Sequence, residues 1–174
     1  MVSRWRKYLC WKKEIEPISV LLLLRMNNNT DPLKILQSAK TILLVDWPDQ
    51  RVPRALLKTG FTVFGFSPDG YAAAALVDAL PEGQTGFAPR NGDDKGYLIF
   101  NKLDKAPDSV DIVCIYRPEA EHGAIIENKA SPLKAKAVWL QAPLTSAQTA
   151  ALAQQKQLIF IENTDIAETA TRLK

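Results

Sequence analysis

Short apolar runs alternate with helix-like segments along most of the chain, and this alternation constrains the fold more than any other feature. The runs are Thr41–Val45, Phe61–Phe66, Asp111–Tyr116, Ala137–Leu140 and Leu158–Ile161, with a shorter one at Tyr97–Phe100. Strands that are apolar throughout and separated by helices indicate a parallel sheet covered on both faces. Right-handed crossovers then predict a doubly wound α/β fold, with a mainly parallel sheet of about five strands and helices on both faces.

Capping residues predict where the helices between these strands begin and end. Asp31 followed by Pro32 is a strong helix start, and Gly60 ends a helix predicted over Val52–Thr59. The segment Pro81–Asp94 is rich in Gly and Pro and is predicted to be a loop. The other predicted helices are Ala72–Leu80, Pro118–Asn128, a helix from the capping box Thr145–Gln148 to Gln155, and a short one after Asp165.

Length and composition fit one globular domain. Of the 174 residues, 47% are hydrophobic and 24% are charged, which is ordinary for a folded chain and leaves little room for a second domain. The net charge of +3 belongs to residues 1–26, which hold six basic and two acidic side chains, so the remainder is close to neutral. This distribution does not favour a nucleic-acid partner.

Residues 1–30 differ from the rest and are interpreted as an N-terminal extension of a domain at 31–174. We favour a translation start at Met26, because the upstream residues lack a sustained apolar stripe at helical spacing. The alternative is a basic arm that contacts a membrane or a partner. The apolar stretch Ile18–Leu24 is too short to span a bilayer, and the two cysteines have no metal or disulfide spacing. We expect a cytoplasmic protein with no membrane and no metal.

The candidate site follows from the rule that open α/β sheets bind ligands at the carboxyl ends of their strands. Side chains in the loops after the predicted strands, and at the start of the first crossover helix, are therefore the candidates. They are Asp46, Trp47, Arg51, Arg54, Ser67, Pro68, Arg117, Gln141 and Thr164.

Several of these residues have a structural alternative. Arg51 and Arg54 either meet phosphates or belong to a solvated helix face. Arg117 either contacts a ligand or forms an ion pair with Glu119 or Glu121. Trp47 either stacks on an adenine or fills an empty cleft. Gln141 bonds either a ligand or loop backbone, and we favour the ligand because of the family resemblance described next.

Three segments resemble the CoA-binding-domain family, small Rossmann-like proteins related to the CoA- and nucleotide-binding domain of succinyl-CoA synthetase alpha. They are TILLVDWPDQRVPRALLKTGFTVFGFSP, VDIVCIYRPEAE and KAVWLQAPLTSAQTAALAQQKQLIFIENTDIAE. The run Val138–Gln141 is the most specific part, followed by Arg117-Pro118-Glu119. The resemblance covers 31–174 except an enlarged loop near Tyr71–Gly92. It implies a Rossmann-like fold and CoA or a related nucleotide as the ligand.

The chain departs from the family pattern in the loops that would hold the ligand. In the family, a Gly-containing turn after the first strand lets the backbone approach the pyrophosphate. Here the turn is Asp46-Trp47-Pro48, which adds a negative charge and a bulky ring and lacks an N–H at Pro48. Pro143 stands where the family tends to have Gly, and Thr164 where it has a late cysteine. A degenerate phosphate loop is therefore predicted.

The sequence contains no recognisable catalytic set. It has no G-x-G-x-x-G, Walker A or Ser-elbow motif, and its one histidine, His122, is expected to be exposed. We therefore expect a non-catalytic CoA- or nucleotide-binding module. One alternative is a ligand-free relic of the fold that serves protein–protein interaction, which a cleft filled by Trp47 would support. The other is an enzyme of unassigned chemistry, with Asp46, Glu119 and Asp165 as its proton-transfer candidates.

Overall fold

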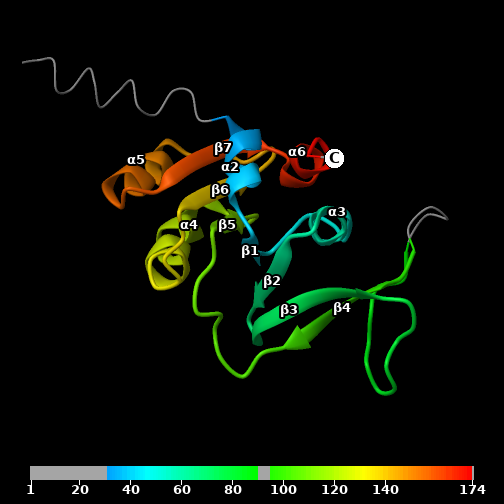
Figure 1. The fold of residues 1–174 in the computed structure, drawn as a ribbon. Helices are drawn as coiled ribbons and strands as arrows, with labels where there is room; N and C mark the ends of the chain where they lie inside the picture. The colour runs from blue at the N-terminus through cyan, green and yellow to red at the C-terminus, as the bar shows by residue number, and fades with distance from the viewer. Residues whose placement is uncertain (1–30, 90–94, 174) are drawn as a thin grey trace, which may run out of the picture.

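Seven strands form one sheet in the computed structural model, which describes residues 31–89 and 95–173 (Figure 1). Their order in space is β4-β3-β2-β1-β5-β6-β7. The five neighbouring strands β2, β1, β5, β6 and β7 run parallel to one another. At the β2 edge, β3 pairs antiparallel with β2, and β4 pairs antiparallel with β3. The strands are β1 (Thr41–Val45), β2 (Thr62–Ser67), β3 (Gly70–Val77), β4 (Tyr97–Lys102), β5 (Ile112–Ile115), β6 (Ala137–Gln141) and β7 (Ile159–Thr164). The mainly parallel sheet is confirmed, but it has seven strands rather than about five.

The helices begin at the capping residues that the sequence predicts, with one shift. Asp31 and Asp165 accept backbone N–H groups of the first turns of α2 and α6. The cap of α5 is Ser146 rather than Thr145, because the Ser146 hydroxyl accepts the Thr149 N–H. The helices are α2 (Pro32–Ser38), α3 (Arg51–Thr59), α4 (Glu119–Ile125) with its π-helical continuation η1 (Ile126–Ala130), α5 (Ala147–Gln155) and α6 (Ile166–Thr171). None of the described helices has the length and apolar character that a membrane crossing requires.

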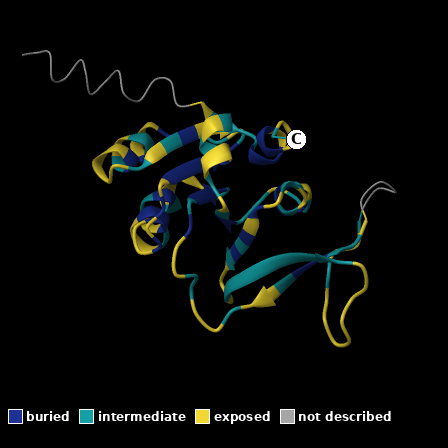
Figure 2. Cartoon of the chain, viewed as in Figure 1, coloured by how far each residue is buried: buried dark blue, intermediate teal, exposed yellow. Residues whose placement is uncertain are grey.

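Helices cover both faces of the sheet, and each face has its own apolar layer (Figure 1). On one face, Leu56 of α3 and Ile166 of α6 share a core with Ile42 of β1. On the other face, Ile125 of α4 shares a core with Leu43 of the same strand. Successive residues of a strand point to opposite faces, so an apolar run such as 42–45 fills both layers. Figure 2 shows the resulting buried centre, with the β3–β4 hairpin more exposed.

The segment predicted as a helix over Ala72–Leu80 is the strand β3, and this prediction is wrong. Its alanines favour a helix by intrinsic propensity. The tight turn at Gly70, where φ is 108°, instead folds the chain back on β2. β3 then pairs with β2 on one edge and with β4 on the other, so backbone pairing on both sides outweighs the local preference. The predicted extension at 1–30 and the start at Met26 lie outside the described residues.

Arg54 anchors the hairpin region to α3. Its side chain is 2% exposed, and its guanidinium donates to the carbonyl oxygens of Phe87 at 2.6 Å and Gly96 at 3.0 Å. A third hydrogen bond, 3.1 Å long, reaches Gln50 on the same helix. The alternative prediction that Arg54 belongs to a solvated helix face is therefore wrong. Its guanidinium donates hydrogen bonds to groups within the protein.

We expect Arg54→Ala to lower the free energy of unfolding by about 3 kcal/mol, because it removes a buried side chain and the three hydrogen bonds of its guanidinium. Arg51→Ala is the matched control in the same helix. The Arg51 side chain is 60% exposed and its ion pair lies at the surface, so that change should cost no more than about 1 kcal/mol. Urea unfolding of both variants checks the difference, and equal losses would contradict the anchoring role.

Candidate functional site

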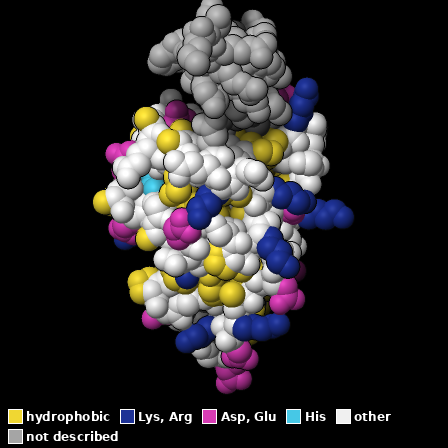
Figure 3. All heavy atoms as spheres, turned by 90° about the vertical axis from the view of Figure 1, so that its left-hand side faces the viewer, with side chains coloured by type: hydrophobic (Ala, Val, Ile, Leu, Met, Phe, Trp, Pro, Cys, Tyr) yellow, Lys and Arg dark blue, Asp and Glu magenta, His cyan; other side chains and the backbone are white. Residues whose placement is uncertain are grey.

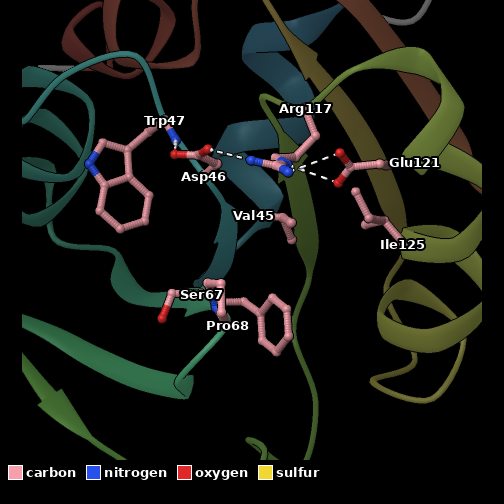
Figure 4. A pocket seen from close by; sticks show the side chains of 9 residues that line it. Val45, Asp46, Trp47, Ser67, Pro68, Arg117, Glu121 and Ile125 are labelled. Atoms are coloured by element: carbon pink, nitrogen blue, oxygen red, sulfur yellow. Dashed lines mark hydrogen bonds and ion pairs between the residues drawn. The ribbon is translucent and has the colours of Figure 1, made fainter.

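A pocket of about 310 Å³ opens at the carboxyl ends of β1, β2 and β5 (Figure 4). The chain leaves β1 toward β2 on one side, while β5 lies on the other, so the crossovers diverge and a crevice remains between them. The lining residues are Val45, Asp46, Trp47, Phe66, Ser67, Pro68, Arg117, Glu121 and Ile125. Five of the nine residues predicted from sequence therefore lie together in one pocket.

Arg117 is the positive charge of this pocket, and two carboxylates hold it. Its Nε and one terminal nitrogen each lie 2.9 Å from a carboxylate oxygen of Glu121, and its other terminal nitrogen lies 3.2 Å from Asp46 (Figure 4). Hydrogen bonding to Arg117 holds the pKa of Glu121 below its ordinary value. The ion-pair alternative for Arg117 is confirmed with Glu121 as the partner. With all three groups ionised, the set carries one net negative charge.

The turn from β1 to α3 uses its own carboxylates to satisfy its backbone donors. The Trp47 N–H donates to Asp46 Oδ1 at 2.9 Å, and the Arg51 N–H donates to Asp49 Oδ1 at 2.7 Å. Pro48 has no N–H to offer. Asp46 itself has a φ of 64°, a left-handed conformation that glycine adopts more readily. In Rossmann-type nucleotide-binding proteins the N–H groups of the corresponding turn bind phosphate, whereas in this protein two of the turn's N–H groups already have carboxylate acceptors.

Trp47 stacks on Phe100 of β4 and also lines the pocket. The ring centroids are 4.9 Å apart and the planes differ by 17°. Gly65 of β2 makes room for this pair, because a Cβ added there would lie 3.0 Å from the Phe100 ring and 3.3 Å from the Trp47 ring. The stacking partner of Trp47 in the described fold thus comes from the β3–β4 hairpin.

The remaining predicted residues lie outside the pocket. Arg51 pairs with Asp165 at 2.7 Å, and the side-chain oxygen of Gln141 accepts the Ile166 N–H at 3.0 Å. The Thr164 carbonyl accepts the indole N–H of Trp139 at 2.8 Å. Burial raises the pKa of Asp165, but the Glu168 N–H, Arg51 and Gln141 together bring it below its ordinary value. Arg51 and Gln141 thus connect α3 and the end of β6 to the start of α6, and the Trp139–Thr164 hydrogen bond connects β6 to β7.

Sequence reasoning missed part of the site and misplaced one residue. The sequence pattern predicts Glu121 only as an ion-pair partner and does not predict Ile125, although spacings of four residues place both on the helix face that Arg117 reaches. Phe100 could not be found without knowing that the hairpin folds back. His122 was expected to be exposed but is 2% exposed, because its ring nitrogens bond Thr149 and the carbonyl of Arg117.

The described residues offer no arrangement for a metal ion, since they contain no group of three or more His, Cys, Asp or Glu side chains that could hold one. Cys114 is buried in β5, and burial raises the pKa of its thiol. A protonated and inaccessible thiol is a poor nucleophile and a poor metal ligand.

Comparison with known proteins identifies the family. The family described as "CoA binding domain" matches residues 48–167, which is more than half of the chain, so this protein belongs to that family. Prb, the PH1109 protein redesigned for binding, has a similar crystal structure: the TM-score is 0.57, the identity is 20%, and the match covers 85% of this chain and 94% of Prb. The structure of cell-free ID.343 from Thermus thermophilus is also similar, with a TM-score of 0.55 and a sequence identity of 18%. That match covers 83% of this chain and 100% of the Thermus thermophilus chain. The search of curated proteins finds no match.

The stacking of Trp47 on Phe100 predicts a measurable coupling energy. In a double-mutant cycle with Trp47→Ala and Phe100→Ala, unfolding free energies should show a favourable coupling of about 0.5–1.5 kcal/mol. A cycle that combines Trp47→Ala with Phe160→Ala serves as the control, because Phe160 packs in the other apolar layer and the two effects should add within about 0.5 kcal/mol. Additive effects in the first cycle would contradict the pairing.

Proposed function

We propose that this protein is a non-catalytic binding module for CoA or a related nucleotide, with the ligand in the pocket at the carboxyl ends of β1, β2 and β5. Membership of the CoA binding domain family supports the ligand class. The strand order, which reverses at β1, supports both a Rossmann-like, doubly wound arrangement and the location of the site.

The pocket combines apolar lining residues with one charged hydrogen-bond donor group, the guanidinium of Arg117. Trp47, Pro68 and Ile125 offer surfaces for an adenine ring or for the pantetheine arm of CoA. Arg117 is the group that would meet a phosphate, and the Ser67 hydroxyl lies at the same rim. Arg54 is not part of this proposal, because its donors are engaged with backbone carbonyls.

The observation that carries the proposal of a degenerate phosphate loop is the self-occupied turn. Asp46 accepts the N–H group of Trp47, and Asp49 accepts that of Arg51. A pyrophosphate that binds either N–H group must therefore displace the carboxylate bonded to it and lie close to the other negatively charged carboxylate. A hydrogen bond that cannot form costs about 0.5–1.5 kcal/mol, and repulsion from Asp46 adds about 1 kcal/mol or more. At about 1.4 kcal/mol per decade, CoA should bind one or two orders of magnitude more weakly than to a glycine turn.

The charge distribution supports a small-molecule ligand and a binding role. Figure 3 shows basic, acidic and apolar side chains intermixed on the face that α4 and α5 cover, which is not the basic stripe expected of a nucleic-acid-binding surface. The acids that line the pocket, Asp46 and Glu121, are both paired with Arg117 and are poorly placed to transfer protons. We also propose that the protein is cytoplasmic, because the sequence has only two cysteines and they do not have the spacing of a disulfide framework.

One observation favours a second candidate function, a relic of the fold that serves protein–protein interaction. Trp47 lies in the turn where the family has glycine, and it stacks on Phe100 and narrows the site. The pocket that remains, about 310 Å³, is at the small end of ligand sites. It would hold one part of CoA rather than the whole molecule.

Calorimetry with CoA separates the two candidates. We expect the wild-type protein to bind CoA with a Kd weaker than micromolar, and more weakly as salt increases, because the charge of Arg117 provides the attraction. Asp46→Asn should strengthen binding about five- to tenfold by removing the repulsion and releasing Arg117, and Asp46→Gly should strengthen it further by relaxing the turn.

Asp69→Asn is the matched control, since Asp69 follows Ser67 at the rim but does not line the pocket or pair with Arg117. It should leave the affinity nearly unchanged. Tight, salt-independent binding by the wild type would show that the turn is no obstacle. No binding by the wild type or by either Asp46 variant would favour the protein–protein role.

A further inference from the structure

A buried chain of hydrogen bonds links the end of β5 to the start of α5, beside the pocket. His122 Nε2 lies 2.8 Å from the carbonyl oxygen of Arg117, and Nδ1 lies 2.8 Å from Thr149 Oγ1. Thr149 Oγ1 lies 2.8 Å from Ser146 Oγ, which in turn contacts a carboxylate oxygen of Glu119. His122 and Thr149 are 2% exposed and Ser146 is 4% exposed, so water has little access to the middle of the chain.

Counting hydrogens shows that this chain needs one more proton than neutral His122 and ionised Glu119 supply. A carbonyl oxygen only accepts, so Nε2 must donate to Arg117. Three contacts then remain, from Nδ1 to the carboxylate, and the two hydroxyl groups supply only two hydrogens for them. Without a further proton, one contact would bring two lone pairs face to face in a buried site, which is costly.

We propose that His122 and Glu119 hold this extra proton in common, as an imidazolium and a carboxylate joined through two hydroxyl groups. The His122 imidazolium donates from both nitrogens, Thr149 donates to Ser146, and Ser146 donates to Glu119. If Nδ1 passes its hydrogen to Thr149, Thr149 passes its own to Ser146, and Ser146 passes its own to Glu119, then the proton ends on Glu119 and the ring becomes neutral. Each hydroxyl group then donates toward the ring, and every contact is kept. The chain is thus a relay between a buried ring and a carboxylate at the surface.

The charges around the ring support the imidazolium form. Glu119 and Glu121 lie on its own helix, and Glu162 of β7 accepts the Ser146 N–H at 2.9 Å at the other end of the relay. Arg117 is the cation next to this group, and it is already paired with Glu121 and Asp46. A buried cation persists only with such compensation.

The relay makes His122 a positioning residue for Arg117. The ring holds the Arg117 carbonyl at the point where β5 ends, and the Arg117 side chain continues from there into the pocket. The same ring connects α4 to α5 through Thr149, so the shared proton joins the pocket rim to the helix behind it. This inference concerns the protein alone and does not depend on which ligand the pocket binds.

NMR of the untagged full chain tests the proposal directly, because the chain has one histidine and its ring nitrogens give one set of signals. At neutral pH we expect both ring nitrogens of the wild type to carry protons. Glu119→Gln should remove the proton on Nδ1 and keep the one on Nε2. The new amide donates to Ser146 from the other end, the hydroxyl hydrogens reverse, and Nδ1 becomes an acceptor.

Glu162→Gln is the matched control, since it removes the same charge beside Ser146 without entering the relay, and both ring protons should remain. A wild-type ring with a proton on Nε2 alone would overturn the proposal. So would an equal loss of the Nδ1 proton in both variants, which would indicate general electrostatics rather than a relay. Thr149→Val interrupts the chain and should also leave one ring proton; if that variant fails to fold, the glutamate pair still decides.

Discussion

The ion pairs of Arg117 with Asp46 and Glu121 join the segments that follow the neighbouring strands β1 and β5, and the character of the site depends on them. Asp46 follows β1, whereas Arg117 and Glu121 follow β5, so these interactions connect pocket-lining residues from strands that are far apart in the sequence. They also neutralise the cation that a phosphate would seek. The pocket therefore has the position of a nucleotide site but little attraction for an anion.

The turn after β1 and the β3–β4 hairpin support each other through one aromatic contact. Here Phe100 of β4 stacks on Trp47, and Gly65 leaves the space beneath the two rings. Arg54 then fixes the base of the hairpin loop to α3. The β3–β4 hairpin thus supports a residue that lines the pocket.

The parts of this structure that could be predicted from sequence are those set by local rules. Apolar runs gave the parallel strands, and the carboxyl-end rule brought Asp46, Ser67 and Arg117 to one pocket. Ala72–Leu80 was mispredicted because its preference as an isolated segment is helical, and only pairing with two neighbours makes it a strand. Burial of His122 could not be predicted either, because its partners on α5 come together only in the folded chain.

The central claim is that a CoA-like ligand enters this pocket and competes with Asp46 for Arg117. Titration with CoA, followed by the NMR signals of the side-chain N–H groups, tests it most directly. The account predicts saturable shifts of the Trp47 indole N–H and of the Arg117 Nε–H, while the Trp139 indole N–H, buried and bonded to Thr164, stays in place. Shifts confined to Trp139, or none at Trp47 and Arg117 at millimolar CoA, would contradict it.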